Sequence, residues 1–189
     1  IAPDGSVWFT QMRADRIAHL VVTGTADTPD YAITEYHTPS LDGGSPYGIV
    51  VVGQRIWFAQ MANDLVTCFM PDDIWVDVYG FLPGVPDEPH ALVVDSSSLV
   101  WGTERSGNRV SSTSFGTLPM IVPHGLSPPE SLPTGIAVDA SDNLWFTQWG
   151  AGQIGRLTAS FQKSYYPLPS PGLAPTGIAI GSDGRVWVV

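Results

Sequence analysis

The chain has 189 residues and a formal net charge of −10, from 18 acidic residues against 8 basic ones. This balance disfavours nucleic acid and anionic membranes as partners, because both would be repelled. No apolar stretch approaches the roughly 20 residues of a membrane-spanning helix, and a single cysteine, Cys68, excludes an internal disulfide framework. Seven tryptophans, 20 glycines and 17 prolines indicate short strands separated by tight turns.

An internal repeat runs through the chain from a shortened first copy near residue 1. Later copies open with a proline at intervals of 42–44 residues, so the units start near residues 47, 90, 134 and 176. One tryptophan recurs at the matching place of every copy: Trp8, Trp57, Trp101, Trp145 and Trp187. A period of this length indicates one small supersecondary unit that is stacked several times.

Each copy has the pattern of a small antiparallel sheet. In the copy that begins at Pro133, an apolar run after Gly135 predicts a first strand, and Ser141–Asn143 supplies a turn. Further strands are expected at 144–147, 154–157 and 165–169. Four short strands per copy predict an all-β protein, a β-propeller with four blades and part of a fifth in one domain over residues 1–189. The tryptophans are expected to pack between blades, and Cys68 to be a buried apolar residue.

The predicted propeller is incomplete, because the fifth copy has residues for two strands only. An open propeller exposes sheet edges, which proteins usually avoid. We therefore expect the chain to be a fragment of a larger ring, or to be completed by a second chain.

The third copy carries three residues that the other copies lack. Glu88 precedes its opening proline, His90 follows that proline, and Glu104 lies three residues after its tryptophan. The other copies hold neither acids nor histidines at these places. The residues that match Glu88 are Ser45, Leu132 and Ala174, those that match His90 are Tyr47, Thr134 and Thr176, and those that match Glu104 are Gln11, Gln60 and Gln148. Carboxylates suit a hard metal ion such as Mg²⁺, and a neutral imidazole suits proton transfer. A loop turn at Glu88–His90 and a solvated ion pair between Glu104 and Arg105 are the structural alternatives.

The repeat as a whole resembles that of the streptogramin B lyases, also called virginiamycin B lyases. The shared pattern is Pro-x-Gly-Ile, then Leu-Trp-Phe-Thr, then Ile-Gly-Arg-Leu, and its best copy runs from Pro133 to Leu157. The resemblance extends along the chain and is weakest from Ser111 to Pro129. It implies a seven-bladed ring, of which this chain would supply a little more than half.

The resemblance also implies roles for single residues. The family carries a Glu-Pro-His run and a second glutamate 14 residues after the histidine, as Glu88, His90 and Glu104 do here. By resemblance, Glu88 and Glu104 hold Mg²⁺ and His90 is the general base. The implied reaction is a β-elimination that opens the ester of a cyclic depsipeptide, as in antibiotic resistance, in a cytoplasmic carbon–oxygen lyase. The residue that follows each opening proline is called the opening slot. Tyr47 and Thr134, in the opening slots of the neighbouring copies, are expected to line the substrate.

One departure and two rival functions remain open. The family places a second histidine in a neighbouring opening slot, where this chain has Tyr47. A phenol can stack or hydrogen-bond but cannot replace an imidazole at neutral pH, which puts the particular substrate in doubt. A metal-dependent, lactonase-like hydrolase would need an Asn/Asp-rich calcium site that the opening slots do not offer. A non-catalytic binding propeller would tolerate Glu104→Gln, since other copies already carry glutamine there.

Overall fold

The computed structural model is an all-β protein whose small antiparallel sheets follow one another along the chain. It describes residues 1–25, 27–28, 30–38, 43–71, 76–80, 87–113, 121–170 and 172–189, with only the backbone within 76–80. No helix in this described part is long and apolar enough to cross a membrane. Residues 114–120, which fall in the stretch of weakest family resemblance, lie outside it.

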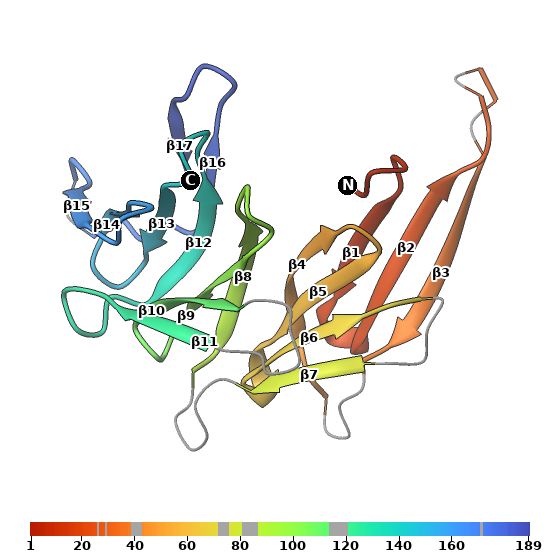
Figure 1. Cartoon of the computed structure of the whole chain (residues 1–189), viewed down its shortest axis with the longest axis horizontal. Coiled ribbons are helices and arrows are strands. Elements are labelled where there is room, and N and C mark those ends of the chain that lie inside the picture. The colour runs from red at the N-terminus through yellow and green to blue at the C-terminus, as the bar shows by residue number, and fades with distance from the viewer. Residues whose placement is uncertain are drawn as a thin grey trace.

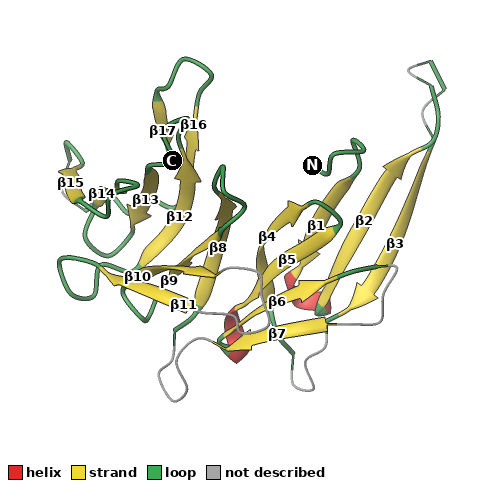
Figure 2. Cartoon of the chain, in the orientation of Figure 1, coloured by secondary structure: helices red, strands yellow, loops and turns green. Residues whose placement is uncertain are grey.

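The strands form four larger sheets and a small fifth one. The first sheet holds β1 (Val7–Gln11), β2 (Arg16–Val22) and β3 (Tyr31–His37), and the second holds β4 (Pro46–Val52), β5 (Arg55–Gln60), β6 (Leu65–Phe69) and β7 (Val76–Gly80). The third holds β8 (Pro89–Val94), β9 (Val100–Glu104), β10 (Arg109–Thr113) and β11 (Ile121–Gly125). The fourth holds β12 (Pro133–Val138), β13 (Leu144–Gln148), β14 (Gln153–Leu157) and β15 (Lys163–Pro167), and the fifth pairs β16 (Ile178–Ile180) with β17 (Val186–Val188). Two short 3-10 turns, η1 (Met12–Ala14) and η2 (Met61–Asn63), complete the secondary structure of the described residues (Figure 2).

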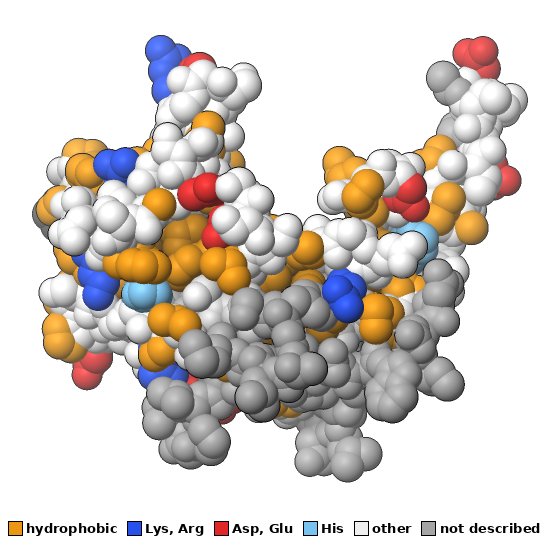
Figure 3. Space-filling model, viewed as in Figure 1, with side chains coloured by type: hydrophobic (Ala, Val, Ile, Leu, Met, Phe, Trp, Pro, Cys, Tyr) orange, Lys and Arg blue, Asp and Glu red, His pale blue; other side chains and the backbone are white. Residues whose placement is uncertain are grey.

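This arrangement confirms the predicted β-propeller with four blades and part of a fifth. The sheets follow one another around an arc, with the first and the fifth at its two ends (Figure 1). The space-filling view is hollowed between those two ends (Figure 3). The repeated tryptophan lies on the second strand of the later blades and on β1 in the first. Strands β1–β3 therefore correspond to the second, third and fourth strands of a complete blade.

Apolar side chains fill the spaces between successive blades. Trp57 and Cys68 of the second blade are buried with Leu92 and Val100 of the third, which confirms the burial predicted for Cys68. Two further clusters repeat this packing, one around Trp8, Ile17, Ile56 and Phe58, the other around Trp101, Val110, Ile136, Leu144, Phe146 and Leu157. Trp187 is 61% exposed on the last strand. Packing against a following blade is thus what buries the tryptophans.

The first strands of neighbouring blades approach one another closely. Strand β4 lies beside β8, β8 beside β12, and β12 beside β16. A Cβ at Gly48 would lie 2.5 Å from the His90 carbonyl oxygen, and one at Gly135 would collide with the Thr176 carbonyl oxygen. Glycine is therefore required after the opening slots of the second and fourth blades, whereas the third blade has Ala91 at this place. This approach places successive opening slots side by side.

Gly48→Ala is expected to lower the free energy of unfolding by about 1–3 kcal/mol, the usual cost of overpacking. The new methyl group would meet backbone atoms of His90 and Ala91, which cannot turn aside. Urea denaturation followed by tryptophan fluorescence measures the change. Gly125→Ala is the matched control, since a Cβ there meets nothing within 4 Å among the described residues. Equal stability of the two variants would contradict the close approach.

Candidate functional site

In three blades, a side-chain oxygen of the preceding blade holds the opening loop, the short segment before the opening proline. The accepting residues, Asp15, Asp64 and Asn108, all have left-handed backbones, with φ of 54°, 54° and 52°. Asp15 accepts the backbone N–H of Gly44, Asp64 those of Asp87 and Glu88, and Asn108 that of Ser131, at 2.7–2.9 Å. The same side-chain-to-backbone hydrogen bond thus positions the backbone before the opening proline in the second, third and fourth blades.

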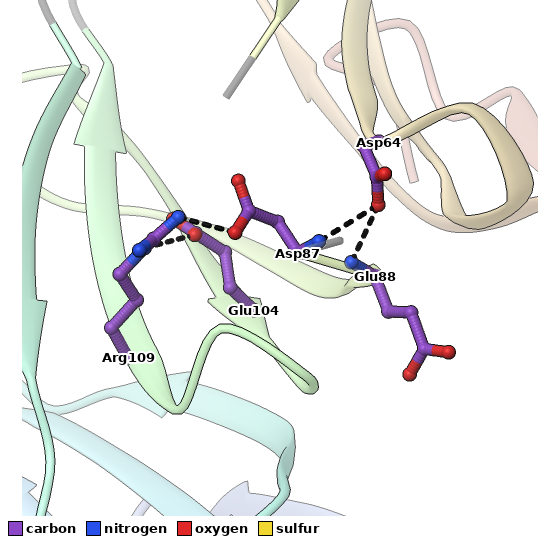
Figure 4. Close-up of polar contacts among 5 residues, drawn as sticks. All are labelled: Asp64, Asp87, Glu88, Glu104 and Arg109. Atoms are coloured by element: carbon purple, nitrogen blue, oxygen red, sulfur yellow. Dashed lines mark hydrogen bonds and ion pairs between the residues drawn. The ribbon is translucent and has the colours of Figure 1, made fainter. Parts of the chain in front are cut away.

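Glu88 occupies a strained position that belongs to the repeat. Its φ is 47°, and the matching residues Ser45 and Leu132 have φ of 48° and 50°. The Glu88 carboxylate pairs with Arg105 at 3.5 Å, where both side chains are partly exposed. It points away from Glu104 in Figure 4. The fold therefore fixes the Glu88 backbone beside Asp64 but does not bring its carboxylate to Glu104.

Glu104 is fully buried and is held by an arginine that sequence reasoning missed. The register places Arg109 of β10 and Pro89 of β8 opposite Glu104 on its two sides. Arg109 donates from Nε to Glu104 Oε2 and from Nη2 to Asp87 Oδ1 (Figure 4). Asp87 is also fully buried, with 0% of its surface exposed. Arg109 therefore links the Glu104 carboxylate to that of Asp87, and not to that of Glu88.

Two buried carboxylates share a single guanidinium, and their burial raises the pKa of both. Burial raises the pKa of Glu104 to about 7, while Ser111 and Arg109 oppose the increase. Burial also raises the pKa of Asp87. One oxygen of each carboxylate, Glu104 Oε1 and Asp87 Oδ2, is buried without a hydrogen-bond partner among the described residues. With both carboxylates ionised, the cluster would carry one more negative charge than Arg109 neutralises.

The donor chemistry of the site fits a magnesium ion. Carboxylate oxygens are the hard ligands that Mg²⁺ prefers, and Glu104 Oε1 is a buried oxygen with no protein partner in the described part of the chain. The described residues contain no group of three or more His, Cys, Asp and Glu side chains already gathered to hold a metal. Glu104 is therefore the candidate buried donor, and the Glu88 carboxylate would have to leave Arg105 to join it.

His90 lies against the Tyr47 ring at a tilt, and its Nδ1 nitrogen is buried. The ring centroids of Tyr47 and His90 are 3.9 Å apart, and 44% of Tyr47 is exposed. His90 is half-buried, and its Nδ1 has no hydrogen-bond partner within the described ranges. Burial lowers the pKa of His90 from its usual value of 6.5, while the Thr134 backbone opposes the shift. The imidazole is therefore neutral at pH 7 and able to accept a proton.

Thr134 is placed next to the third blade but turns its hydroxyl inward. It is buried, and its Oγ1 lies 2.9 Å from Thr147 Oγ1. Its carbonyl oxygen accepts a hydrogen bond of 2.7 Å from the Thr103 hydroxyl. The structure thus gives Thr134 a part in joining blades, and a contact between its side chain and a substrate stays a prediction.

The fold and the site together define a β-propeller in which one blade is chemically distinct. The model of the Virginiamycin B lyase family matches residues 1–189, and the chain belongs to this family. A virginiamycin B lyase of Nocardia farcinica is 25% identical over 193 residues, which cover 98% of this chain and 60% of that protein. The recognition made from the repeat is confirmed.

Solved structures give the same picture. The chain is similar to virginiamycin B lyase from Staphylococcus aureus, with 28% identity and a TM-score of 0.87, over 100% of this chain and 61% of that one. A catalytically inactive histidine-to-alanine variant of the staphylococcal enzyme, crystallised with quinupristin, is 27% identical, with a TM-score of 0.84 over 100% of this chain and 60% of the other. A putative 6-phosphogluconolactonase from Bacteroides uniformis, 12% identical with a TM-score of 0.76, shares the fold alone. The chain spans about 60% of the length of the lyases it matches.

The raised pKa of Glu104 predicts a pH dependence of stability. Between its ordinary value of 4.5 and about 7, the folded state keeps a proton that the unfolded state releases. The free energy of unfolding should therefore fall as pH rises through this window, with a slope of at most roughly 1.4 kcal/mol per pH unit from this group. Glu104→Gln removes this contribution and should flatten the slope, leaving that of Asp87. Urea denaturation at several pH values measures it, and equal slopes in both proteins would contradict the shift.

Proposed function

We propose that this protein is a magnesium-dependent carbon–oxygen lyase that opens the ester of a streptogramin B-like cyclic depsipeptide by β-elimination. The observation that carries the proposal is the gathering of Glu88, His90 and Glu104 in one blade of a chain that belongs to the Virginiamycin B lyase family. The staphylococcal relative crystallised with quinupristin supports a small-molecule ligand of this kind. Such a reaction would inactivate an antibiotic of the streptogramin B class.

In this proposal His90 is the general base. Its neutral imidazole, with Nδ1 free of a hydrogen-bond partner among the described side chains, takes the proton from the carbon next to a substrate carbonyl. The electron pair of the broken C–H bond forms a carbon–carbon double bond, and the neighbouring C–O bond of the ester breaks. The ring opens without the addition of water, so the product has the mass of the substrate.

Glu88 and Glu104 are the proposed magnesium ligands. When bound, the ion would polarise the substrate carbonyl and stabilise the negative charge that develops on its oxygen. Glu104 offers Oε1 from a buried carboxylate whose other oxygen is held by Arg109. Glu88 pairs with Arg105 at 3.5 Å in a partly exposed position, and such a pair is worth at most about 1 kcal/mol. Moving the Glu88 carboxylate from Arg105 to a metal ion would therefore cost little free energy.

Tyr47 and Thr134 are the proposed substrate contacts. The Tyr47 ring lies against His90 and is 44% exposed, so its exposed part would pack on an apolar face of the substrate or donate a hydrogen bond from its hydroxyl. It cannot supply a second imidazole, so the preferred depsipeptide is expected to differ from that of lyases with histidine there. Thr134 is the proposed contact from the opening slot of the next blade, where its carbonyl oxygen accepts a hydrogen bond from the Thr103 hydroxyl.

Incubating the full natural protein with a streptogramin B depsipeptide and Mg²⁺ should give a ring-opened product of unchanged mass. His90→Ala should slow this reaction by about 100-fold or more, the usual contribution of a general base, and EDTA should abolish it. Mass spectrometry measures both the product and its rate of formation. His37→Ala is the matched control, because His37 is an exposed histidine outside the opening slots.

Two results would contradict the proposal. A product with the mass of one added water would indicate hydrolysis and favour the lactonase-like alternative. The absence of any product, together with absence of magnesium binding, would indicate a binding propeller that shares only the fold and repeat of the family.

A further inference from the structure

The polar cluster around Glu104 has a neutral counterpart in the fourth blade. There the matching residues are Ser131, Gln148 and Gln153, and Gln148 Nε2 donates to Ser131 Oγ. Gln153 Nε2 donates to Gln148 Oε1 at 2.7 Å. In the third blade the same three places hold Asp87, Glu104 and Arg109. The repeat is therefore stable with an uncharged network at these positions, and the third blade has replaced every member by an ionisable one.

A fourth position has changed together with these three. The residue three places after Glu104 is Gly107, where the other blades carry Ala14, Asn63 and Ala151. A Cβ at Gly107 would lie 2.9 Å from Asp87 Oδ1, 3.1 Å from Glu104 Oε2 and 3.3 Å from Arg109 Cζ. A side chain here would press on the ionic cluster, so the glycine makes room for it.

The ionic cluster of Asp87, Glu104 and Arg109 is not expected to stabilise the fold better than a neutral network would. A buried carboxylate oxygen without a hydrogen-bond partner is costly, and replacing buried ion pairs by well-packed neutral residues is often neutral or stabilising. In the described structure Glu104 Oε1 and Asp87 Oδ2 are two such oxygens in one cluster. The fourth blade shows that a neutral solution fits the same backbone.

We propose that Arg109 is a positioning residue for Glu104, and that Asp87 fixes Arg109 in turn. The planar guanidinium binds Glu104 through Nε and Asp87 through Nη2, a geometry that lysine cannot reproduce. It occupies Oε2 of Glu104 and leaves Oε1 as the oxygen offered to a divalent cation. This inference rests on the proposed function, because it assigns Glu104 a cation to bind.

The first half of the test needs no metal. Arg109→Gln leaves two buried carboxylates without their cation and should lower the melting temperature by roughly 6 °C or more. The triple variant Asp87→Ser, Glu104→Gln, Arg109→Gln copies the fourth blade and should recover most of this loss. Recovery shows that the fold does not need the ionic cluster. A triple variant as unstable as the single one would overturn the inference, since the cluster would then be structural.

The second half measures binding of Mn²⁺, a spectroscopic substitute for Mg²⁺, by electron paramagnetic resonance on the full natural protein. Glu104→Gln should abolish binding, and Asp87→Asn and Arg109→Lys should each weaken it by about 10–100-fold, as outer-shell substitutions do. Arg16→Gln is the matched control, because Arg16 has the place of Arg109 in the first blade but pairs with the exposed Glu35.

The possible results separate the two proposals. If Glu104→Gln abolishes binding while Asp87→Asn and Arg109→Lys bind Mn²⁺ as tightly as the parent protein or more tightly, the positioning role is wrong and the proposed function stands. If Glu104→Gln binds Mn²⁺ as the parent protein does, both the metal site and the positioning role are overturned.

Discussion

The close approach of first strands at the propeller axis is the constraint on which the candidate site depends. Gly48 has no side chain to separate β4 from the His90 backbone, so the opening slots of two blades lie in contact. This contact brings the Tyr47 and His90 rings together at a tilt, and the His90 imidazole is half-buried there. The burial in turn keeps the imidazole neutral at pH 7, which is the state a general base needs.

A second constraint comes from the side-chain oxygens that hold the opening loops. Asp64, on the blade before, accepts both the Asp87 and the Glu88 backbone N–H, and so it fixes the backbone of two successive acidic residues. One of them, Asp87, turns inward to Arg109 and Glu104, whereas the other turns toward Arg105 and solvent. The proposed metal site is therefore half preorganised, with a buried donor held by Arg109 and a partly exposed one paired with Arg105.

Much of the fold could be predicted from the sequence, because each copy of the repeat corresponds to one blade. The tryptophan period, the turn residues and the glycine after the opening slots of the second, fourth and fifth blades follow from packing that recurs along the chain. The third blade could be singled out in the same way, since comparison between copies isolates Glu88, His90 and Glu104. The contacts of these residues could not be predicted, because they depend on cross-strand register and rotamers. Arg109 is adjacent to Glu104 only across the β9–β10 hairpin, and the inward turn of Thr134 depends on Thr147 in the next strand.

The central claim is that the third blade binds a divalent cation through Glu104, and diffraction from Mn²⁺-soaked crystals of the full natural protein tests it most directly. The account predicts an anomalous peak within coordination distance of Glu104 Oε1, with the Glu88 carboxylate turned away from Arg105 toward the ion. An absent peak under saturating Mn²⁺, or a peak only at a site remote from the third blade, would contradict it.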